Sequence, residues 1–220
     1  MLAAISCGRT QPPAPRGGTE PIPASSVPEA PPPAPVQTAP RLVVLGDSLT
    51  AGLGLPQNAA YPVLLGKKLK EKGYDWEVVN AGVSGDTSGD GRQRMGWALE
   101  GDVRILIVAL GANDGLRGLP VGQMKENLQT IIDRGRQRGI PVLLVGMEAP
   151  PNYGDRYAKE FREVYGDLAR QNKVEFVPFL LEGVAGVSRL NQSDGIHPTS
   201  AGAERIADHL WPALEKMLKK

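Results

Sequence analysis

From residue 41 onward, short apolar runs alternate with segments in which apolar residues recur at helical spacing. The apolar runs have the length of buried strands, and they cover residues 42–45, 76–79, 103–110, 142–145 and 174–177. The helical spacing of three and four positions is shown by Val121, Met124, Leu128, Ile131 and Ile132, and again by Phe161, Val164, Tyr165 and Leu168. The pattern therefore predicts five strands separated by helices.

A final helix is predicted after residue 200. Apolar residues at helical spacing mark it, with Thr199 or Ser200 as its cap, and they include Ala201, Ile206, Leu210 and Leu214. Strands that are apolar on both faces and alternate with helices favour a parallel sheet covered on each side. We therefore expect an α/β fold, a flavodoxin-like three-layer α/β/α sandwich with a parallel sheet of about five strands.

The first 40 residues differ in composition from the rest. Residues 11–40 contain 11 of the chain's 20 prolines and almost no large apolar residues, so they bury too little surface to offset the entropy of ordering. We expect a leader and disordered linker over residues 1–40, followed by one domain over residues 41–220. A proline-rich leader without a role is the alternative.

The start of the chain resembles the end of a bacterial lipoprotein signal. A short apolar stretch with small residues leads to Cys7, but it is too short for a complete signal and lacks the positive n-region. Either the start is trimmed or misassigned, or the resemblance is accidental. We expect an exported protein, periplasmic or anchored to the membrane as a lipoprotein through Cys7.

Charge and cysteine content narrow the classes of function. Lys and Arg total 25 against 24 acidic residues, which gives no electrostatic reason to expect nucleic acid as a partner. Cys7 is the single cysteine, so an internal disulfide is excluded and thiols are too few for a structural zinc site. We expect a monomer that needs no metal or cofactor.

A serine follows the first predicted strand directly. Ser48 lies between Gly46 and Gly52, and glycines allow a sharp turn at the carboxyl end of a strand. In open α/β sheets the functional groups lie at the carboxyl ends of the strands, so Ser48 is a candidate nucleophile. A serine that only caps the next helix is the simpler alternative.

A histidine base for this serine must be His197 or His209. His209 lies within the last predicted helix, where a surface or packing role is expected. His197 follows Asp194 by three positions in a turn-rich loop. At that spacing the carboxylate can reach the ring Nδ1, fix the tautomer and leave Nε2 free to face Ser48.

Acyl transfer also needs donors for the oxyanion of the tetrahedral intermediate. The first three strand ends supply three candidates: the backbone N–H of Ser48, the N–H of Gly85 and the side-chain amide of Asn113. Gly85 and Asn113 could each be an ordinary turn residue instead. The neighbouring carboxylates of Asp86 and Asp114 are expected to brace these loops by hydrogen bonds to turn backbone.

The segments after the third and fourth predicted strands supply apolar side chains for a substrate pocket. The candidates are Leu116, Leu119, Met147 and Tyr153, which could hold an alkyl or aryl group. Packing of the same residues onto the body of the domain is the alternative.

Four blocks resemble the signature of the SGNH, or GDSL, hydrolase superfamily over residues 41–220. They are Gly46-Asp47-Ser48-Leu49, the segment 84–88 with Gly85, Gly111-x-Asn113-Asp114 and Asp194-x-x-His197. Segments 80–88, 115–118 and 151–154 are similar to its bacterial arylesterase, acyl thioesterase and lysophospholipase group. Thr50 replaces the second glycine of Gly-x-Ser-x-Gly, which argues against the α/β-hydrolase elbow.

The resemblance implies a serine esterase with Ser48 as nucleophile, His197 as base and Asp194 as the residue that orients it. Ser48, Gly85 and Asn113 would form the oxyanion hole, and small aryl, alkyl, thio- or lysophospholipid esters would be the substrates. An O-acetylesterase acting on cell-envelope carbohydrate with the same triad is a second interpretation. A third is a flavodoxin-like binding module without catalysis.

Overall fold

The computed structural model describes residues 39–219. The predicted leader, Cys7 and all but the last two residues of the predicted linker lie outside the described residues. The structural statements below concern residues 39–219.

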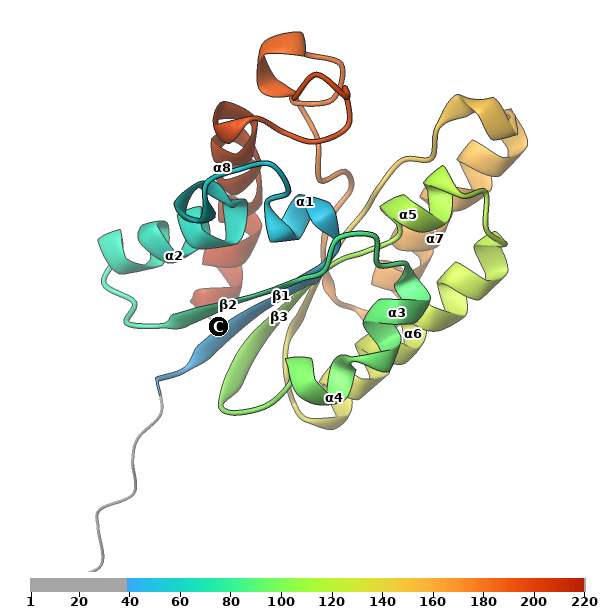
Figure 1. The fold of residues 1–220 in the computed structure, drawn as a ribbon. Coiled ribbons are helices and arrows are strands. Elements are labelled where there is room, and N and C mark those ends of the chain that lie inside the picture. Colours follow the sequence, from blue (N-terminus) through green and yellow to red (C-terminus); the bar gives the residue numbers. More distant parts are fainter. Residues whose placement is uncertain (1–38, 220) are drawn as a thin grey trace, which may run out of the picture. The chain divides into compact units, whose positions relative to one another are not determined.

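The described chain contains a five-stranded parallel sheet (Figure 1). Its strands lie in the order β2-β1-β3-β4-β5. Their bounds are β1 Arg41–Gly46, β2 Glu77–Gly82, β3 Val103–Ala109, β4 Val142–Val145 and β5 Glu175–Val177. Each coincides with a predicted apolar run to within three residues at either end, so the predicted α/β sheet is confirmed.

The apolar runs of the central strands are buried on both faces. In β1 all residues from Leu42 to Gly46 are buried, and β4 is buried throughout. The register aligns the carboxyl ends of the first three strands, because Gly46 pairs with Gly82 on one side and with Ala109 on the other. The loops that follow β1, β2 and β3 therefore begin side by side at one edge of the sheet.

The described residues contain eight α-helices. Their bounds are α1 Ser48–Ala51, α2 Tyr61–Glu71, α3 Ser88–Gln93, α4 Met95–Ala98, α5 Ala112–Leu116, α6 Val121–Gln137, α7 Asp155–Asn172 and α8 Ser200–Leu218. Short 3-10 turns form at η1 Gln57–Ala59, η2 Pro151–Tyr153 and η3 Ser188–Leu190.

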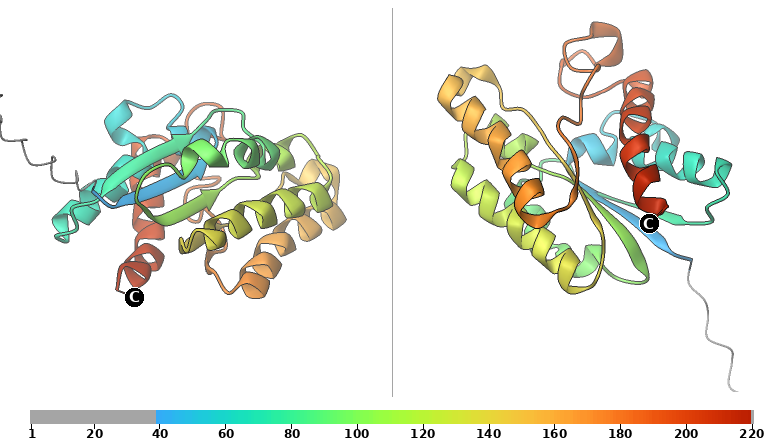
Figure 2. Two further views of the ribbon diagram at one scale, coloured as in Figure 1. Left: turned by 90° about the horizontal axis from the view of Figure 1, so that it is seen from below. Right: turned by 180° about the vertical axis from the view of Figure 1, so that it is seen from behind.

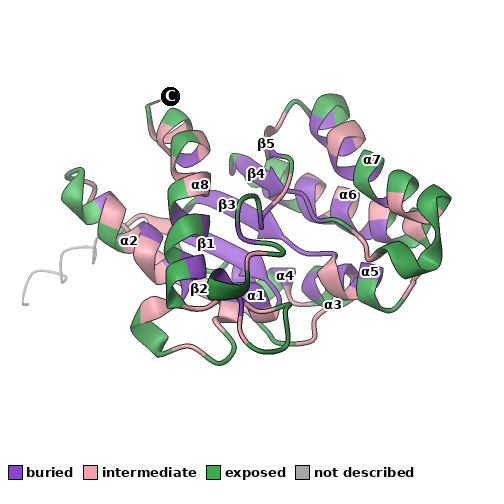
Figure 3. Ribbon diagram, turned by 90° about the horizontal axis from the view of Figure 1, so that it is seen from above, coloured by how far each residue is buried: buried purple, intermediate pink, exposed green. Residues whose placement is uncertain are grey.

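The helices form two outer layers. Helices α2 and α8 cover one face of the sheet, and α3, α6 and α7 cover the other (Figures 1 and 2). Their buried sides face the strands (Figure 3), and in α6 and α7 these sides carry the apolar residues that the sequence pattern placed there. Thr199 is the cap of α8, because its side chain accepts the N–H of Gly202 at 3.3 Å. The predicted three-layer sandwich is thus confirmed.

No helix among residues 39–219 has both the length and the apolar character needed to cross a membrane.

Candidate active site

Ser48 is the first residue of α1 and stands at the carboxyl end of β1. Helix α1 begins at once because Asp47 caps it, with Oδ1 accepting the N–H of Leu49 at 3.0 Å. Gly46 permits the close turn, since a Cβ at this position would lie 1.9 Å from the Thr50 Oγ1. Ser48 therefore sits at the edge where the loops after β1, β2 and β3 meet.

His197 and Asp194 lie in the loop that leads into α8. This loop is closed on itself by a bridge between Asn191 and Pro198 and by the N–H of Gln192, which donates to the carbonyl of His197 at 2.7 Å. The closed loop turns the His197 ring toward Ser48, a residue 149 positions earlier in the chain.

Three side chains form a continuous hydrogen-bonded chain. The Nδ1 of His197 lies 2.7 Å from Oδ2 of Asp194, and its Nε2 lies 2.9 Å from Oγ of Ser48. Oδ1 of Asp194 accepts the backbone N–H groups of Ile196 at 2.9 Å and His197 at 3.0 Å.

The backbone N–H of His197, and next its side chain, lower the pKa of Asp194 to about 2. The carboxylate is therefore ionised at neutral pH and accepts Nδ1–H. This fixes the tautomer in which Nε2 is free to accept the Ser48 proton.

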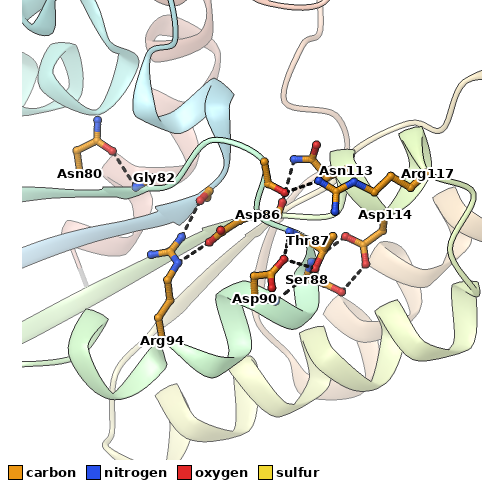
Figure 4. A network of polar contacts seen from close by, with 12 residues as sticks. Asn80, Gly82, Asp86, Thr87, Ser88, Asp90, Arg94, Asn113, Asp114 and Arg117 are labelled. Atoms are coloured by element: carbon orange, nitrogen blue, oxygen red, sulfur yellow. Dashed lines mark hydrogen bonds and ion pairs between the residues drawn. The ribbon is translucent and has the colours of Figure 1, made fainter.

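Gly85 occupies a tight turn after β2. The N–H of Asp86 donates to the carbonyl of Val83 at 3.1 Å, and Gly85 has φ +89°, the conformation that the third position of a type II turn requires. Arg117 donates from Nη2 to the carbonyl of Gly85 at 2.8 Å (Figure 4). The peptide group between Gly85 and Asp86 is thus held at both its N–H and its carbonyl.

Asn113 lies in the first turn of α5. Its Nδ2 donates to the backbone carbonyl of Asp86 at 2.9 Å (Figure 4). An amide nitrogen carries two hydrogens, so this bond orients the group and leaves the second hydrogen available.

The carboxylates that follow Gly85 and Asn113 in the chain, Asp86 and Asp114, brace the loops in different ways. Asp114 accepts the N–H of Ser88 at 2.7 Å and its Oγ–H at 2.6 Å, in line with the predicted bonding to turn backbone. The prediction for Asp86 was wrong in its partner, because the Asp86 carboxylate contacts the Arg94 guanidinium at 2.5 Å instead. The sequence pattern did not point to Arg94.

Four of the residues predicted for the triad and the oxyanion hole line a single cavity of about 590 Å³, namely Ser48, Gly85, Asn113 and His197. The volume lies in the range of small-molecule sites. Asp194 does not line this cavity and lies behind His197.

The predicted pocket residues divide into two pairs. Leu116 and Met147 line the cavity, whereas Leu119 and Tyr153 are not among its lining residues. The Tyr153 ring packs over Gly118, and its hydroxyl donates to the carbonyl of Leu116 at 3.0 Å, which holds the ring against the turn after α5.

Further apolar residues of the cavity were missed by the sequence reasoning. They come from the turn after α1 and from the segment between β5 and α8, and they are Leu53, Phe179, Leu181, Ala185 and Ile196. Their position in the sequence could have indicated them, because the segment after β5 starts at the same edge of the sheet and leads to Asp194.

Asp47 is a buried acid directly before Ser48 in the chain. It is 1% exposed, and its Oδ2 has no hydrogen-bond partner within residues 39–219. Burial raises the pKa of Asp47 to about 6, against the opposing effect of the N–H of Leu49. The negative charge of Asp86 raises it further, and His197 lowers it.

Other polar groups fall outside the site. His209 donates from Nε2 to the carbonyl of Phe179 at 3.0 Å, which agrees with the expected packing role. Residues 39–219 contain no group of three or more His, Cys, Asp or Glu side chains placed to hold a metal ion.

The geometry agrees with what comparison to known proteins finds. The family described as GDSL-like Lipase/Acylhydrolase matches residues 44–205. The chain belongs to this family. The predicted membership of the GDSL, or SGNH, superfamily is thereby confirmed.

Three relatives with established names are similar over most of their length. Esterase TesA of Pseudomonas aeruginosa is 45% identical over 82% of this chain and 90% of its own. An arylesterase of Vibrio mimicus is 38% identical over 83% and 92%. Thioesterase 1/protease 1/lysophospholipase L1 of Escherichia coli K12 is 38% identical over 82% and 86%.

Solved structures agree with this assignment. A crystal structure of TesA superposes with a TM-score of 0.77 at 45% identity, over 81% of this chain and 99% of that one. The psychrotrophic esterase EstA of Pseudoalteromonas sp., in a structure inhibited by monoethylphosphonate, gives 0.77 at 32% identity over 82% and 99%.

Proposed function

We propose that this GDSL family member is a serine esterase that hydrolyses small carboxylic esters through an acyl-enzyme. The observation that carries the proposal is the position of His197, whose two ring nitrogens contact Asp194 and Ser48 beside a substrate-sized cavity. The names of the relatives, which are esterase, arylesterase and thioesterase/lysophospholipase, support the same class of reaction.

The first half-reaction forms the acyl-enzyme. Nε2 of neutral His197 takes the proton of Ser48 as Oγ attacks the ester carbonyl carbon. The carbonyl π electrons move to oxygen, and the tetrahedral intermediate collapses as His197 gives its proton to the departing alcohol, phenol or thiol.

The second half-reaction returns the enzyme to its starting state. A water molecule loses a proton to Nε2 and attacks the acyl carbon. The collapsing intermediate then releases the acid, and His197 returns the proton to Oγ of Ser48. Asp194, ionised because its pKa is lowered to about 2, stabilises the imidazolium in both halves.

The developing oxyanion is bound by the backbone N–H groups of Ser48 and Gly85 and by the amide of Asn113. All three residues line the cavity beside Ser48 Oγ. The first N–H groups of a helix lack intrahelical partners, so the N–H of Ser48 at the start of α1 is free for this role. Loss of one such donor lowers kcat by roughly 10²–10³-fold.

The walls of the cavity support acyl or aryl esters over sugar esters. Leu53, Leu116, Met147 and Phe179 offer apolar contacts, which suit an alkyl chain or ring. A carbohydrate O-acetylesterase would need mostly polar walls around the sugar ring, whereas the polar Ser84, Glu148 and Asn191 are outnumbered here by apolar lining residues. Alkyl, aryl, thio- and lysophospholipid esters differ in leaving group and acyl chain length, so a series of esters that varies both distinguishes these classes of substrate.

We also propose that residues 1–40 form a leader and linker, and that the protein is exported and tethered through Cys7. The support is the sequence pattern before Cys7 and the proline content that follows it. Membrane fractionation of the full chain tests this, with Cys7→Ala expected in the soluble exported fraction. The hydrolase domain, residues 41–220, is proposed to act as a monomer, which light scattering measures.

Hydrolysis of p-nitrophenyl esters from acetate to decanoate tests the enzymatic proposal. The wild type and Ser193→Ala, a matched serine change in the exposed part of the His197 loop, should hydrolyse these esters and be labelled once by an alkyl fluorophosphonate, which loses fluoride as its phosphorus bonds to a serine oxygen. Ser48→Ala should do neither. A folded wild type that neither hydrolyses any ester nor becomes labelled would refute the proposal and favour a binding module.

A further inference from the structure

Arg94 makes hydrogen bonds both to the end of β1 and to the loop after β2. It lies at the junction of α3 and α4, and its Nη2 donates to the carbonyl of Gly46 at 2.8 Å (Figure 4). Its Nε donates to Oδ2 of Asp86 at 2.5 Å. The Arg94 and Asp86 side chains are only 18% and 12% exposed. One planar guanidinium therefore connects the end of β1 to the loop after β2.

Both contacts lie next to oxyanion donors. Gly46 stands two residues before Ser48, whose N–H is the first donor, and Asp86 follows Gly85, whose N–H is the second. Gly46 also accepts the N–H of Val83 at 3.1 Å. The end of β1 and the turn that carries Gly85 are therefore held to each other and to the same guanidinium.

The third donor depends on the same residue. The amide of Asn113 is oriented by the backbone carbonyl of Asp86, while the side chain of Asp86 is fixed by Arg94. A shift of Asp86 would therefore move the Gly85 turn and the hydrogen-bond acceptor of Asn113 together.

The physical strength of this contact is sufficient to fix a loop. Hydrogen bonds between a guanidinium and a carboxylate are charge-assisted, and little solvent reaches this pair to weaken them. Without Arg94 the Asp86 carboxylate would be left nearly buried and unpaired, which is costly enough that the loop would turn it toward water.

We propose that Arg94 is a positioning residue for the oxyanion hole. It touches no substrate, and it acts by holding Gly46 and Asp86 so that all three donors converge on one point. The inference rests on the proposed function, because it assigns Arg94 a role only if Ser48, Gly85 and Asn113 bind the oxyanion.

A purely structural role for Arg94 predicts a different result. A residue that only stabilises the fold lowers the free energy of unfolding but leaves kcat of the folded enzyme unchanged. A residue that positions oxyanion donors lowers kcat with little effect on KM, because those donors act mainly in the transition state.

The experiment compares Arg94→Met, Arg94→Lys and Asn113→Ala with a control, Arg134→Met. Arg134 is exposed on α6 and donates from Nη1 to the carbonyl of Arg92 in α3 at 2.9 Å, so its loss loosens α3 without touching the oxyanion loops. Circular dichroism and urea unfolding establish the folded fraction of each variant. kcat and KM are measured on the best p-nitrophenyl ester.

We expect Arg94→Met to lower kcat by roughly 10–100-fold with KM within about threefold, less than the loss from one deleted donor. Arg134→Met should keep kcat within about twofold. The double variant Arg94→Met/Asn113→Ala should lose less than the product of the two single losses, because both changes act on one unit.

The outcomes separate the two proposals. Full activity of Asn113→Ala would refute the oxyanion assignment itself. A slow Asn113→Ala beside a folded Arg94→Met with wild-type kcat would overturn the role of Arg94 alone. If Arg94→Met does not fold, Arg94→Lys decides: lysine keeps the charge without the planar fork, so we expect reduced kcat, and wild-type kcat would overturn the proposal.

Discussion

The buried carboxyl of Asp47 makes stability depend on pH in a way that one substitution can isolate. Its pKa is raised from the ordinary 3.8 to about 6 in the folded protein, with burial as the main cause. The folded state therefore binds the proton more tightly than the unfolded chain does. The associated stability is fully present below pH 3.8 and is lost as the pH rises through about 6.

The magnitude follows from the two pKa values. A rise from 3.8 to about 6 corresponds to about 3 kcal/mol of stability present at low pH and absent above neutrality. Asp47→Asn keeps a good helix cap and removes the titration. The variant should therefore gain roughly 2–3 kcal/mol relative to wild type between pH 4 and pH 7.5. A constant cost of burying the amide cancels from this difference.

Urea unfolding of wild type and Asp47→Asn at several pH values from 4 to 8 measures the step. His197 and Asp86 also influence the pKa of Asp47. To separate the effect of His197, wild type and Asp47→Asn are each also measured with the additional substitution His197→Gln. In that background the step should persist and be no smaller, since His197 lowers the pKa of Asp47.

Asp90→Asn is the matched control, because the pKa of Asp90 is lowered, mainly by the N–H of Thr87. Its stabilising contribution is complete above the ordinary carboxyl range and is lost only toward acid pH. The Asp90→Asn difference should therefore stay flat from pH 5 to 8. A difference for Asp47→Asn that is equally flat would refute the reasoning.

Two further predictions concern catalysis. Asp194→Asn should lower kcat by roughly 10²–10⁴-fold, because an amide can donate to Nδ1 and favour the wrong tautomer; a loss below tenfold in ester hydrolysis would contradict the role of Asp194. Phe179→Ala should raise kcat/KM for longer p-nitrophenyl esters relative to the acetate, because Phe179 lines the cavity and the loss of its ring makes room for a longer acyl chain. Phe176→Ala, which removes a partly buried ring outside the cavity, should leave that ratio unchanged, and an equal shift would show that the cavity does not hold the acyl chain.

The sequence by itself determined the fold class, and it predicted which residues meet at the centre of the candidate site. Runs such as residues 142–145 are apolar at every position, as expected of a strand covered on both faces, and β4 is buried throughout. The Asp194 and His197 pair was also readable, because three positions across a turn bring a carboxylate to an imidazole. These features depend on local spacing, which the sequence states directly.

Tertiary structure decided which distant side chains share the site. Ser48 and His197 lie 149 positions apart, and only the sheet order and the closed loop before α8 set their contact at 2.9 Å. Tyr153 was predicted to line the pocket, yet its hydroxyl is held by the carbonyl of Leu116. The residue type of Tyr153 indicated which contacts its side chain can make, but not which neighbours it contacts.

Arg94 shows the same limit most clearly. The residues around Arg94 in the sequence form no distinguishing pattern. Its proposed role arises only because the junction of α3 and α4 brings it into contact with Gly46 at the end of β1 and with Asp86 after β2. Contacts of this kind depend on the relative placement of several elements. The physical reason is that long-range packing, unlike strand or helix pattern, leaves no periodic mark on the chain.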